Sequence, residues 1–414
     1  MRKLITNIGI LAGIDTERKL RLCGKDMSHL NTLNDAWLLI EDGKFKAWGE
    51  MKELPANGIP ADEEIDARGG CVMPSWCDSH THIVYAGSRE GEFVDKIRGL
   101  SYAEIAKRGG GILNSADLLH TLSEDELYRE AMLRVEEIMR KGTGCVEIKS
   151  GYGLNTADEL KMLRVIRRIK ETAPLKVKST FLGAHAVGRG YSQADYVDLV
   201  VNEMIPEVGR EQLADFVDVF CDEGFFTPEE TARILEAADK WGMRPKIHAD
   251  ELASSGGVEV GVKHGALSVD HLESMTVEEI ELLRDSQTMP TVLPGTSFFL
   301  NMPYGKARQI IDSGLPVAVA SDYNPGSTPS GDMKFIVSLA CIKLRLLPAE
   351  AINAATINAA SAMGESRDYG SIAEGKVANC FITEPIPSVD YIPYAYTSPI
   401  VRMVMLKGDV ILTL

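Results

Sequence analysis

The chain has 414 residues, 45% of them hydrophobic and 25% charged, which suits a globular protein long enough for a barrel-type domain and a smaller companion. Its formal net charge of −16 argues against nucleic acid as a partner and against an anionic membrane surface, because both demand a basic face. Seven scattered cysteines without a C-x-x-C pair, and no run resembling a signal peptide or a membrane span, lead us to expect a cytoplasmic protein with reduced thiols.

Short β-like runs open the chain, from residue 1 to about 65. Two of them, 36–40 and 45–48, flank Asp42-Gly43, a pair that favours a tight hairpin turn. Residues 366–414 return to β character after the helical middle of the chain. We therefore expect residues 1–65 and 366–414 to pack together as one small, discontinuous β-sandwich domain.

Between these segments, residues 66–365 alternate short apolar runs with long amphipathic stretches. Strands are expected to end near Asp78, Lys149, Leu182, Cys221, His248, His271, Leu293 and Ser321. Helices are expected over residues 125–141, 157–172, 227–241, 276–285, 303–313 and near 347–362. Roughly eight strand–helix repeats over about 275 residues predict an α/β protein with a (β/α)8 TIM-type barrel. A doubly wound sheet is the rival, but it does not explain which side chains stand at the strand ends.

Histidines gather at these predicted strand ends. His80-Thr-His82 follows the first of them, and residues two apart on an extended chain face the same side, so both imidazoles can reach one metal ion. Five of the eight histidines lie at or just beyond a strand end, namely His80, His82, His185, His248 and His271. Barrel enzymes build their active sites at that face, so the clustering predicts a site there.

Asp322 closes the last predicted strand and is the acidic counterpart of these histidines. An Asp in that position is often only a turn former, yet beside His80, His82 and His248 a ligand role is the better interpretation. Such a set suits zinc or iron, and nitrogen and oxygen ligands alone do not decide between them. His271 is either a further ligand or a hydrogen-bond partner of water or an oxyanion, and we favour the second.

Two other residues near the strand ends bear on the chemistry. Lys149 is a candidate carboxylated lysine of a two-metal site, but we expect one metal and an ordinary lysine. Glu251, three residues beyond His248, can shuttle protons between water and a substrate nitrogen, with an exposed loop acid as the plain alternative. The Gly-rich segment 108–112 lacks the setting of a phosphate-binding loop, and we expect a loop over the barrel mouth.

In several motifs the chain resembles the amidohydrolase superfamily. The likeness rests on Met73-Pro-Ser-Trp-Cys-Asp-Ser-His80-Thr-His82, the later His248, His271 and Asp322, and the flanking β segments. Local motifs are closer still to the imidazolonepropionase family, among them Ala86-Gly-Ser-Arg89, Ser101-Tyr-Ala-Glu-Ile, Glu147-Ile-Lys-Ser-Gly-Tyr152, Leu182-Gly-Ala-His185, His248-Ala-Asp-Glu251 and Ser321-Asp-Tyr-Asn-Pro-Gly-Ser327. The resemblance covers nearly the whole chain.

The resemblance implies a cytosolic homodimer with one Zn²⁺ or Fe³⁺ per subunit. The implied reaction is hydrolysis of the ring C–N bond of 4-imidazolone-5-propanoate to N-formimino-L-glutamate, a step of L-histidine degradation, by metal-activated water. The expected metal ligands are His80, His82, His248 and Asp322.

The residues also suggest how the reaction is divided among them. Asp322 takes the proton of the attacking water, His185 and His271 stabilise the oxyanion, and Glu251 protonates the leaving nitrogen. The substrate's propanoate tail needs a cation, and Arg89 offers a bidentate fork. By the resemblance, the remaining substrate and product contacts are Tyr152, His185, Glu251, Asn324, Gly326 and Ser327.

Two alternatives stay open from the sequence. One is a guanine or cytosine deaminase of the same superfamily, against which Arg89 and Tyr152 argue. The other is a non-catalytic homologue that serves as a scaffold, although such proteins typically lose metal ligands and this chain keeps them all.

Overall fold

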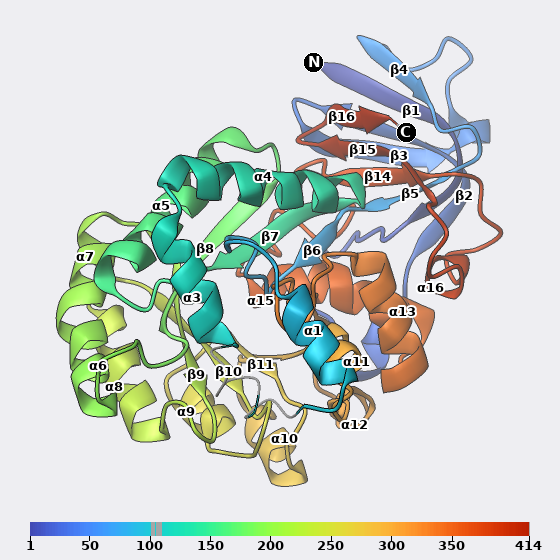
Figure 1. Cartoon of the computed structure of the whole chain (residues 1–414). Helices are drawn as coiled ribbons and strands as arrows, with labels where there is room; N and C mark the ends of the chain where they lie inside the picture. Colours follow the sequence, from blue (N-terminus) through green and yellow to red (C-terminus); the bar gives the residue numbers. More distant parts are fainter. Residues whose placement is uncertain (101–103, 105–109, 414) are drawn as a thin grey trace.

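Two β-sheets organise the computed structural model, which describes residues 1–100, 104 and 110–413 (Figure 1). One sheet joins strands from the two ends of the chain, drawn in blue and red. The other is parallel, and helices surround it. Residues 108 and 109 of the Gly-rich segment expected over the barrel mouth lie outside the described residues.

The terminal sheet has the strand order β16-β15-β14-β5-β1-β2-β3, with β4 paired to β1. Its strands are β1 (Arg2–Ala12), β2 (Thr32–Glu41), β3 (Lys44–Glu50), β4 (Glu63–Asp66), β5 (Cys71–Pro74), β14 (Cys380–Thr383), β15 (Val401–Leu406) and β16 (Asp409–Thr413). The pairing of β14 with β5 brings the C-terminal segment into the N-terminal sheet, as expected. Asp42 and Gly43 both have positive φ, 48° and 75°, so the β2–β3 hairpin turns where the sequence predicts. The domain boundaries at 65 and 366 stay a prediction.

The parallel sheet has its strands in chain order, from β6 to β13. They are β6 (Trp76–Asp78), β7 (Thr143–Lys149), β8 (Lys176–Ala184), β9 (Phe216–Cys221), β10 (Arg244–Ala249), β11 (Ser268–His271), β12 (Met289–Val292) and β13 (Ala318–Val319). Each ends within two residues of the predicted place, so the barrel prediction is confirmed.

The barrel closes just beyond its first and last strands. The backbone N–H of Asp322 donates to the carbonyl of His80 over 3.0 Å, and that of His82 donates to the carbonyl of Tyr323 over 2.9 Å. The chain segments that carry three of the expected metal ligands are therefore joined by backbone hydrogen bonds.

Helices surround the barrel, and two of them, α1 (Glu90–Ile97) and α11 (Pro294–Leu300), line the cavity at its carboxyl end. The others are α3 (Ile112–Thr121), α4 (Glu124–Arg140), α5 (Thr156–Thr172), α6 (Gln193–Leu199), α7 (Ile205–Arg210), α8 (Pro228–Asp239), α9 (Gly257–Lys263), α10 (Val277–Leu283), α12 (Ala307–Asp312), α13 (Met333–Leu344), α14 (Pro348–Asn353) and α15 (Ala359–Ala362), with the short α16 (Tyr391–Tyr394) packed against α13. Side-chain hydrogen bonds cap the N-termini of several of these helices. At α8, for example, Thr227 accepts from the Glu230 backbone while the Glu230 carboxylate accepts from the Thr227 backbone. Among the described residues, no helix is long and apolar enough to cross a bilayer.

Candidate metal centre and active site

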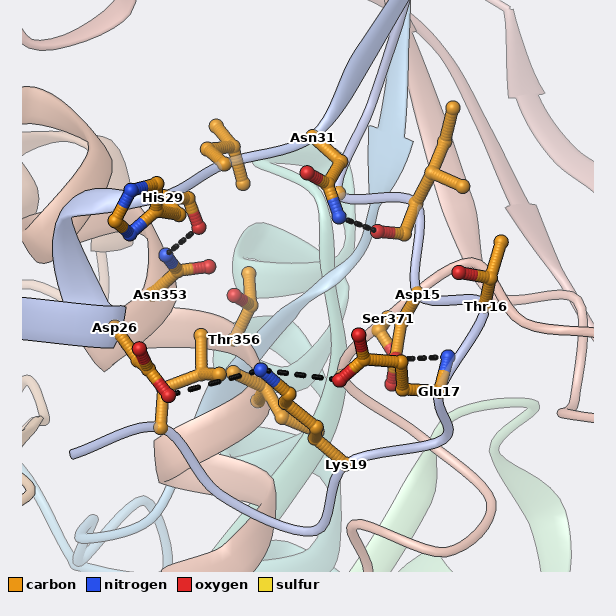
Figure 2. Close-up of a pocket in the computed structure, with 16 residues that line it drawn as sticks. Asp15, Thr16, Glu17, Lys19, Asp26, His29, Asn31, Asn353, Thr356 and Ser371 are labelled. Atoms are coloured by element: carbon orange, nitrogen blue, oxygen red, sulfur yellow. Dashed lines mark hydrogen bonds and ion pairs between the residues drawn. The ribbon is translucent and has the colours of Figure 1, made fainter.

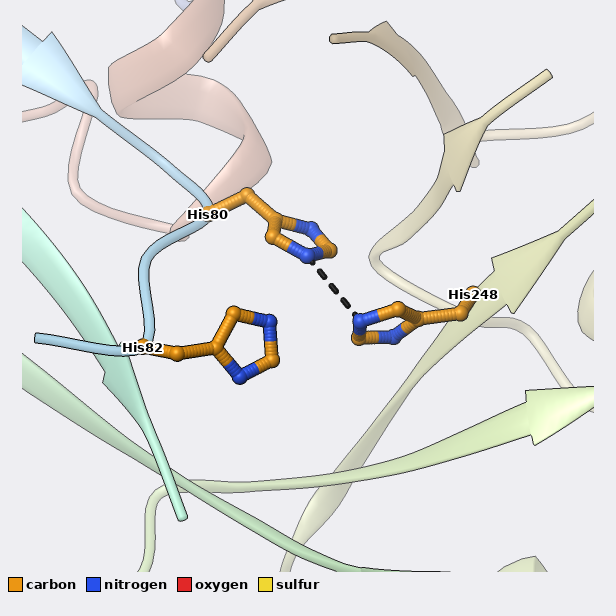
Figure 3. Close-up of side chains that lie close together, drawn as sticks. All are labelled: His80, His82 and His248. Carbon is orange, nitrogen blue, oxygen red and sulfur yellow. Dashed lines mark hydrogen bonds between the residues drawn. The ribbon is translucent and has the colours of Figure 1, made fainter. Parts of the chain in front are cut away.

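Three buried histidines point toward one another at the carboxyl end of the barrel (Figure 3). His80 and His82 follow β6, and His248 lies near the end of β10. The Nε2 atoms of His80 and His248 are 3.0 Å apart. The His82 ring centroid is 5.3 Å from that of His80 and 5.5 Å from that of His248.

Asp322 is the fourth member of this group and follows β13, the last strand of the barrel. Its Oδ1 lies 3.7 Å from Nε2 of His80 and 3.5 Å from Nε2 of His82. Its Oδ2 accepts hydrogen bonds from Thr296 Oγ1 at 2.7 Å and from Ser327 Oγ at 2.9 Å. The two hydroxyls hold one carboxylate oxygen, so the other is directed at the histidines. Sequence reasoning missed Thr296, which stands in the first turn of α11 with no motif around it.

The outer nitrogens of two histidines face buried carboxylates. His80 Nδ1 lies 2.7 Å from Asp270 Oδ2, and His248 Nδ1 lies 2.9 Å from Asp218 Oδ2. An ionised carboxylate only accepts, so each Nδ1 carries the proton and each Nε2 presents a lone pair. Burial, with the charge of Lys149 adding to it, also holds the pKa of His80 well below its usual value.

Two lone pairs facing each other across 3.0 Å repel unless a cation lies against both. The residues present therefore fit a metal ion. Within the described part of the chain, the donor atoms of His80, His82 and His248 lie within 4.8 Å of one another, and so do those of His80, His271 and Asp322. Imidazole nitrogens with one carboxylate suit zinc or iron.

A buried charge network lies behind the histidines, inside the barrel. Lys149 Nζ is 2.5 Å from Glu147 Oε1 and 2.7 Å from Asp218 Oδ2. Lys246 pairs with the other oxygen of Glu147 and lies 3.6 Å from Asp270 Oδ2. These carboxylates raise the pKa of Lys149 against the effect of burial. A carboxylated Lys149 would be anionic and would repel Glu147 and Asp218, so its surroundings favour the ordinary lysine.

Lys149→Met is expected to destabilise the protein by about 3–5 kcal/mol, because removing one partner of a buried ion pair leaves charges uncompensated. The measurement is the free energy of unfolding from a urea titration. Lys25→Met, at an exposed lysine, is the control. Equal unfolding free energies for the two variants would mean that the network does not depend on Lys149.

The candidate metal centre forms one wall of a cavity of about 560 Å³. Every expected site residue except His80 lines it, and they are His82, Arg89, Tyr152, His185, His248, Glu251, His271, Asp322, Asn324, Gly326 and Ser327. His80 lies behind His248 and reaches the same group of nitrogens. The structure thus gathers all twelve residues that the sequence singled out.

Glu251 and His271 form an acid–base pair in this cavity. His271 Nδ1 lies 3.6 Å from Glu251 Oε2 and 3.6 Å from Glu273 Oε2. Burial raises the pKa of Glu251 to about 7. Burial would lower the pKa of His271, but Glu251 and Glu273 outweigh it and raise this pKa to about 10. A proton is therefore available on both residues near neutral pH.

His185 and Tyr152 lie beside His82, with ring centroids 5.3 and 5.8 Å from the His82 centroid. His185 Nδ1 lies 3.0 Å from the Gly151 carbonyl, and burial lowers the pKa of His185 to about 3. The neutral ring therefore carries its proton on Nδ1 and leaves Nε2 as an acceptor. Glu159 fixes the loop that bears Tyr152 by accepting from the backbone N–H groups of Gly151, Gly153 and Leu154.

Arg89 reaches the cavity at the start of α1. Its Nε and Nη2 donate to Glu92 Oε2 at 2.9 and 2.7 Å. A Cβ on residue 326 would lie 2.2 Å from Nη1, so the guanidinium can approach this backbone only because residue 326 is glycine. The Asn324 Oδ1 accepts from the N–H groups of Gly326 and Ser327, which orders the loop that follows Asp322.

A second cavity, of about 330 Å³, lies between the chain after β1, the end of α14 with the turn that follows it, and residues 370–371 (Figure 2). None of the expected site residues lines it. Lys19 is paired there with Glu17 and Asp26, and the Asn31 and Asn353 amides donate to backbone carbonyls. Its polar wall is largely satisfied within the protein.

Comparison with known proteins agrees with this geometry. Residues 71–411 match the amidohydrolase family. The chain is 53% identical to imidazolonepropionase of Christiangramia forsetii over 99% of this chain and 100% of that one, and 52% identical to imidazolonepropionase of Flavobacterium johnsoniae over the same shares. It is 41% identical to that of Thermoanaerobacter pseudethanolicus over 94% of this chain and 93% of that one.

Solved structures share the fold at low identity. An adenosine deaminase from Xanthomonas campestris with bound zinc superposes with a TM-score of 0.72 at 16% identity, covering 99% of this chain and 93% of that one. A guanine deaminase from C. acetobutylicum with bound guanine gives 0.71 at 15% identity, covering 100% of both chains. At such identities the similarity to these structures concerns the fold alone. The relatives at 41–53% identity match nearly the whole chain and therefore indicate the family. The chain therefore belongs to the amidohydrolase family and, within it, to the imidazolonepropionases.

Proposed function

We propose that this chain hydrolyses the ring C–N bond of 4-imidazolone-5-propanoate to give N-formimino-L-glutamate in L-histidine degradation. One Zn²⁺ or Fe³⁺ would be held by His80, His82, His248 and Asp322. The observation that carries the proposal is the convergence of this donor set and the cationic Arg89 on one cavity. Full-length similarity to imidazolonepropionases supports the choice of substrate.

The first step is attack of water on the ring carbonyl. When bound, the metal supplies a lowered pKa for water, which makes the nucleophile available near neutral pH. Asp322 accepts the proton that this water loses, and the two hydroxyls that donate to its Oδ2 keep its Oδ1 facing the histidines.

The later steps need a donor for the oxyanion and a proton for the leaving nitrogen. His271, protonated beside Glu251 and Glu273, donates to the oxyanion. Glu251, whose pKa is about 7, gives its proton to the ring nitrogen as the C–N bond breaks. His185 has its proton on the Gly151 side, so it accepts from a ring N–H instead of stabilising the oxyanion as the sequence suggested.

Arg89→Met is expected to raise KM for 4-imidazolone-5-propanoate by about tenfold to a hundredfold, with kcat little changed, because it removes a charge-assisted contact with the tail. Initial rates across a substrate series check this. A KM equal to that of the wild type would show that the tail binds elsewhere.

The direct test is an ultraviolet assay on freshly generated 4-imidazolone-5-propanoate, with and without a chelator. Hydrolysis that the chelator stops supports the proposal, and the absence of hydrolysis by the metal-loaded protein contradicts it. Ammonia released from guanine or cytosine would instead support the deaminase alternative. Protein purified without stoichiometric zinc or iron would favour the scaffold alternative.

A cytoplasmic location and a homodimeric assembly, both implied by the resemblance, are part of the same proposal. Light scattering on the purified chain measures the assembly, and a monomer mass would contradict it.

A further inference from the structure

A second cation lines the active-site cavity beside Arg89. Lys96 stands near the end of α1, and its Nζ donates to the Gly326 carbonyl over 3.0 Å. The ammonium also lies 5.6 Å from the centroid of the Phe299 ring. In the described part of the chain, no carboxylate lies within ion-pair distance of this ammonium. Lys96 thus has one neutral acceptor and two N–H groups still able to donate.

Arg89, by contrast, is already compensated. Its guanidinium is paired with Glu92, which is held in turn by the Gly111 N–H at 3.0 Å and the Asn114 amide at 3.1 Å. The Arg89–Glu92 pair is therefore fixed in place and contributes no net charge. Lys96 supplies the net positive charge on this side of the cavity.

Gly326 brings the two cations together. Its carbonyl accepts from Lys96, and the place of its missing Cβ is filled by the Arg89 guanidinium. An ammonium and a guanidinium that contact the same backbone unit can together bind the two oxygens of a carboxylate. Burial, and then the charge of Arg89, lower the pKa of Lys96, and the negative charge of an incoming carboxylate would act against this lowering.

We propose that Lys96 binds the propanoate carboxylate of the substrate together with Arg89, and that it is the residue that makes the site selective for acidic ring substrates. This inference rests on the proposed function and deepens it. Arg89 orients the tail through its fixed pair with Glu92, and Lys96 provides the charge that attracts it. Neutral ring compounds gain nothing from Lys96.

The test compares two inhibitors in the metal-loaded enzyme, 3-(imidazol-4-yl)propanoate and 4-methylimidazole, which share a ring and differ in the carboxylate. In Lys96→Met, the inhibition constant of the acid should rise at least about tenfold, the loss typical of a hydrogen bond to a charged group, while that of 4-methylimidazole stays the same. KM for the substrate should rise in parallel and kcat should change less. Lys96→Arg should restore most of the acid's affinity, and Lys25→Met is the exposed control.

The outcomes separate this inference from the proposed function. A wild-type enzyme that binds the acid through Lys96 but does not hydrolyse 4-imidazolone-5-propanoate would contradict the proposed hydrolysis. It would still support the role of Lys96 in binding a carboxylate. A Lys96→Met enzyme with unchanged constants for substrate and acid would overturn the role of Lys96 alone. Equal losses for both inhibitors would also overturn it, because they would mean a general disturbance of the cavity.

Discussion

Asp322→Asn should reduce kcat by about a thousandfold or more, within the range that general-base catalysis contributes together with the loss of an anionic metal ligand. The amide keeps the shape of the carboxylate, and its oxygen can still accept from Thr296 and Ser327. Its NH₂ group then faces the Nε2 atoms of His80 and His82, where it donates and cannot take a proton. The fold should survive while the base is lost.

The measurement is kcat at saturating substrate, together with metal content by elemental analysis. Asp285→Asn, at an exposed carboxylate, is the matched control and should match the wild type. If Asp322→Asn keeps a tenth or more of the wild-type kcat with its metal bound, another group is the base.

Removal of the metal should reduce turnover to below about 1% of the wild type, since uncatalysed water is a poor nucleophile at neutral pH. One equivalent of zinc or iron should restore it, and elemental analysis of the protein as purified measures which of the two it carries. Binding should also raise the thermal unfolding midpoint, because an ion that binds only the folded chain stabilises it.

His80→Ala should lose the metal without any chelator, since it deletes a donor whose Nδ1 is anchored on Asp270. His29→Ala, at an exposed histidine outside the cavity, should keep it. Full hydrolytic activity in protein stripped of every bound ion would contradict the metal site altogether.

Much of this arrangement could be predicted because one topological rule gathers residues that are distant in sequence. Parallel barrel strands all end at the same face, so histidines at the ends of four of the eight predicted strands imply a cluster. The prediction of eight strand ends needed only apolar runs and helix periodicity. The sequence favoured an ordinary Lys149, and the carboxylates that surround this side chain agree with that prediction, but they could not be foreseen.

The residues that hold the site's side chains in place could not be predicted from the sequence. Asp218 and Asp270 stand inside buried strands, where nothing local indicates that they face His248 and His80. His80 and Asp270 are separated by 190 residues, and their contact depends on side-chain direction within the barrel. Glu92 and Thr296 act through hydrogen bonds that no motif reports.

The closure between the two ends of the barrel has a consequence for biosynthesis. Ser321 hydrogen-bonds Asp78 across 243 residues, and the backbone bonds of His80 and Asp322 lie directly beside that contact. During translation, a nascent chain that ends before Asp322 contains only three of the four expected metal ligands. We therefore expect tight metal binding only after residue 322 has been synthesised and the two ends of the barrel have met.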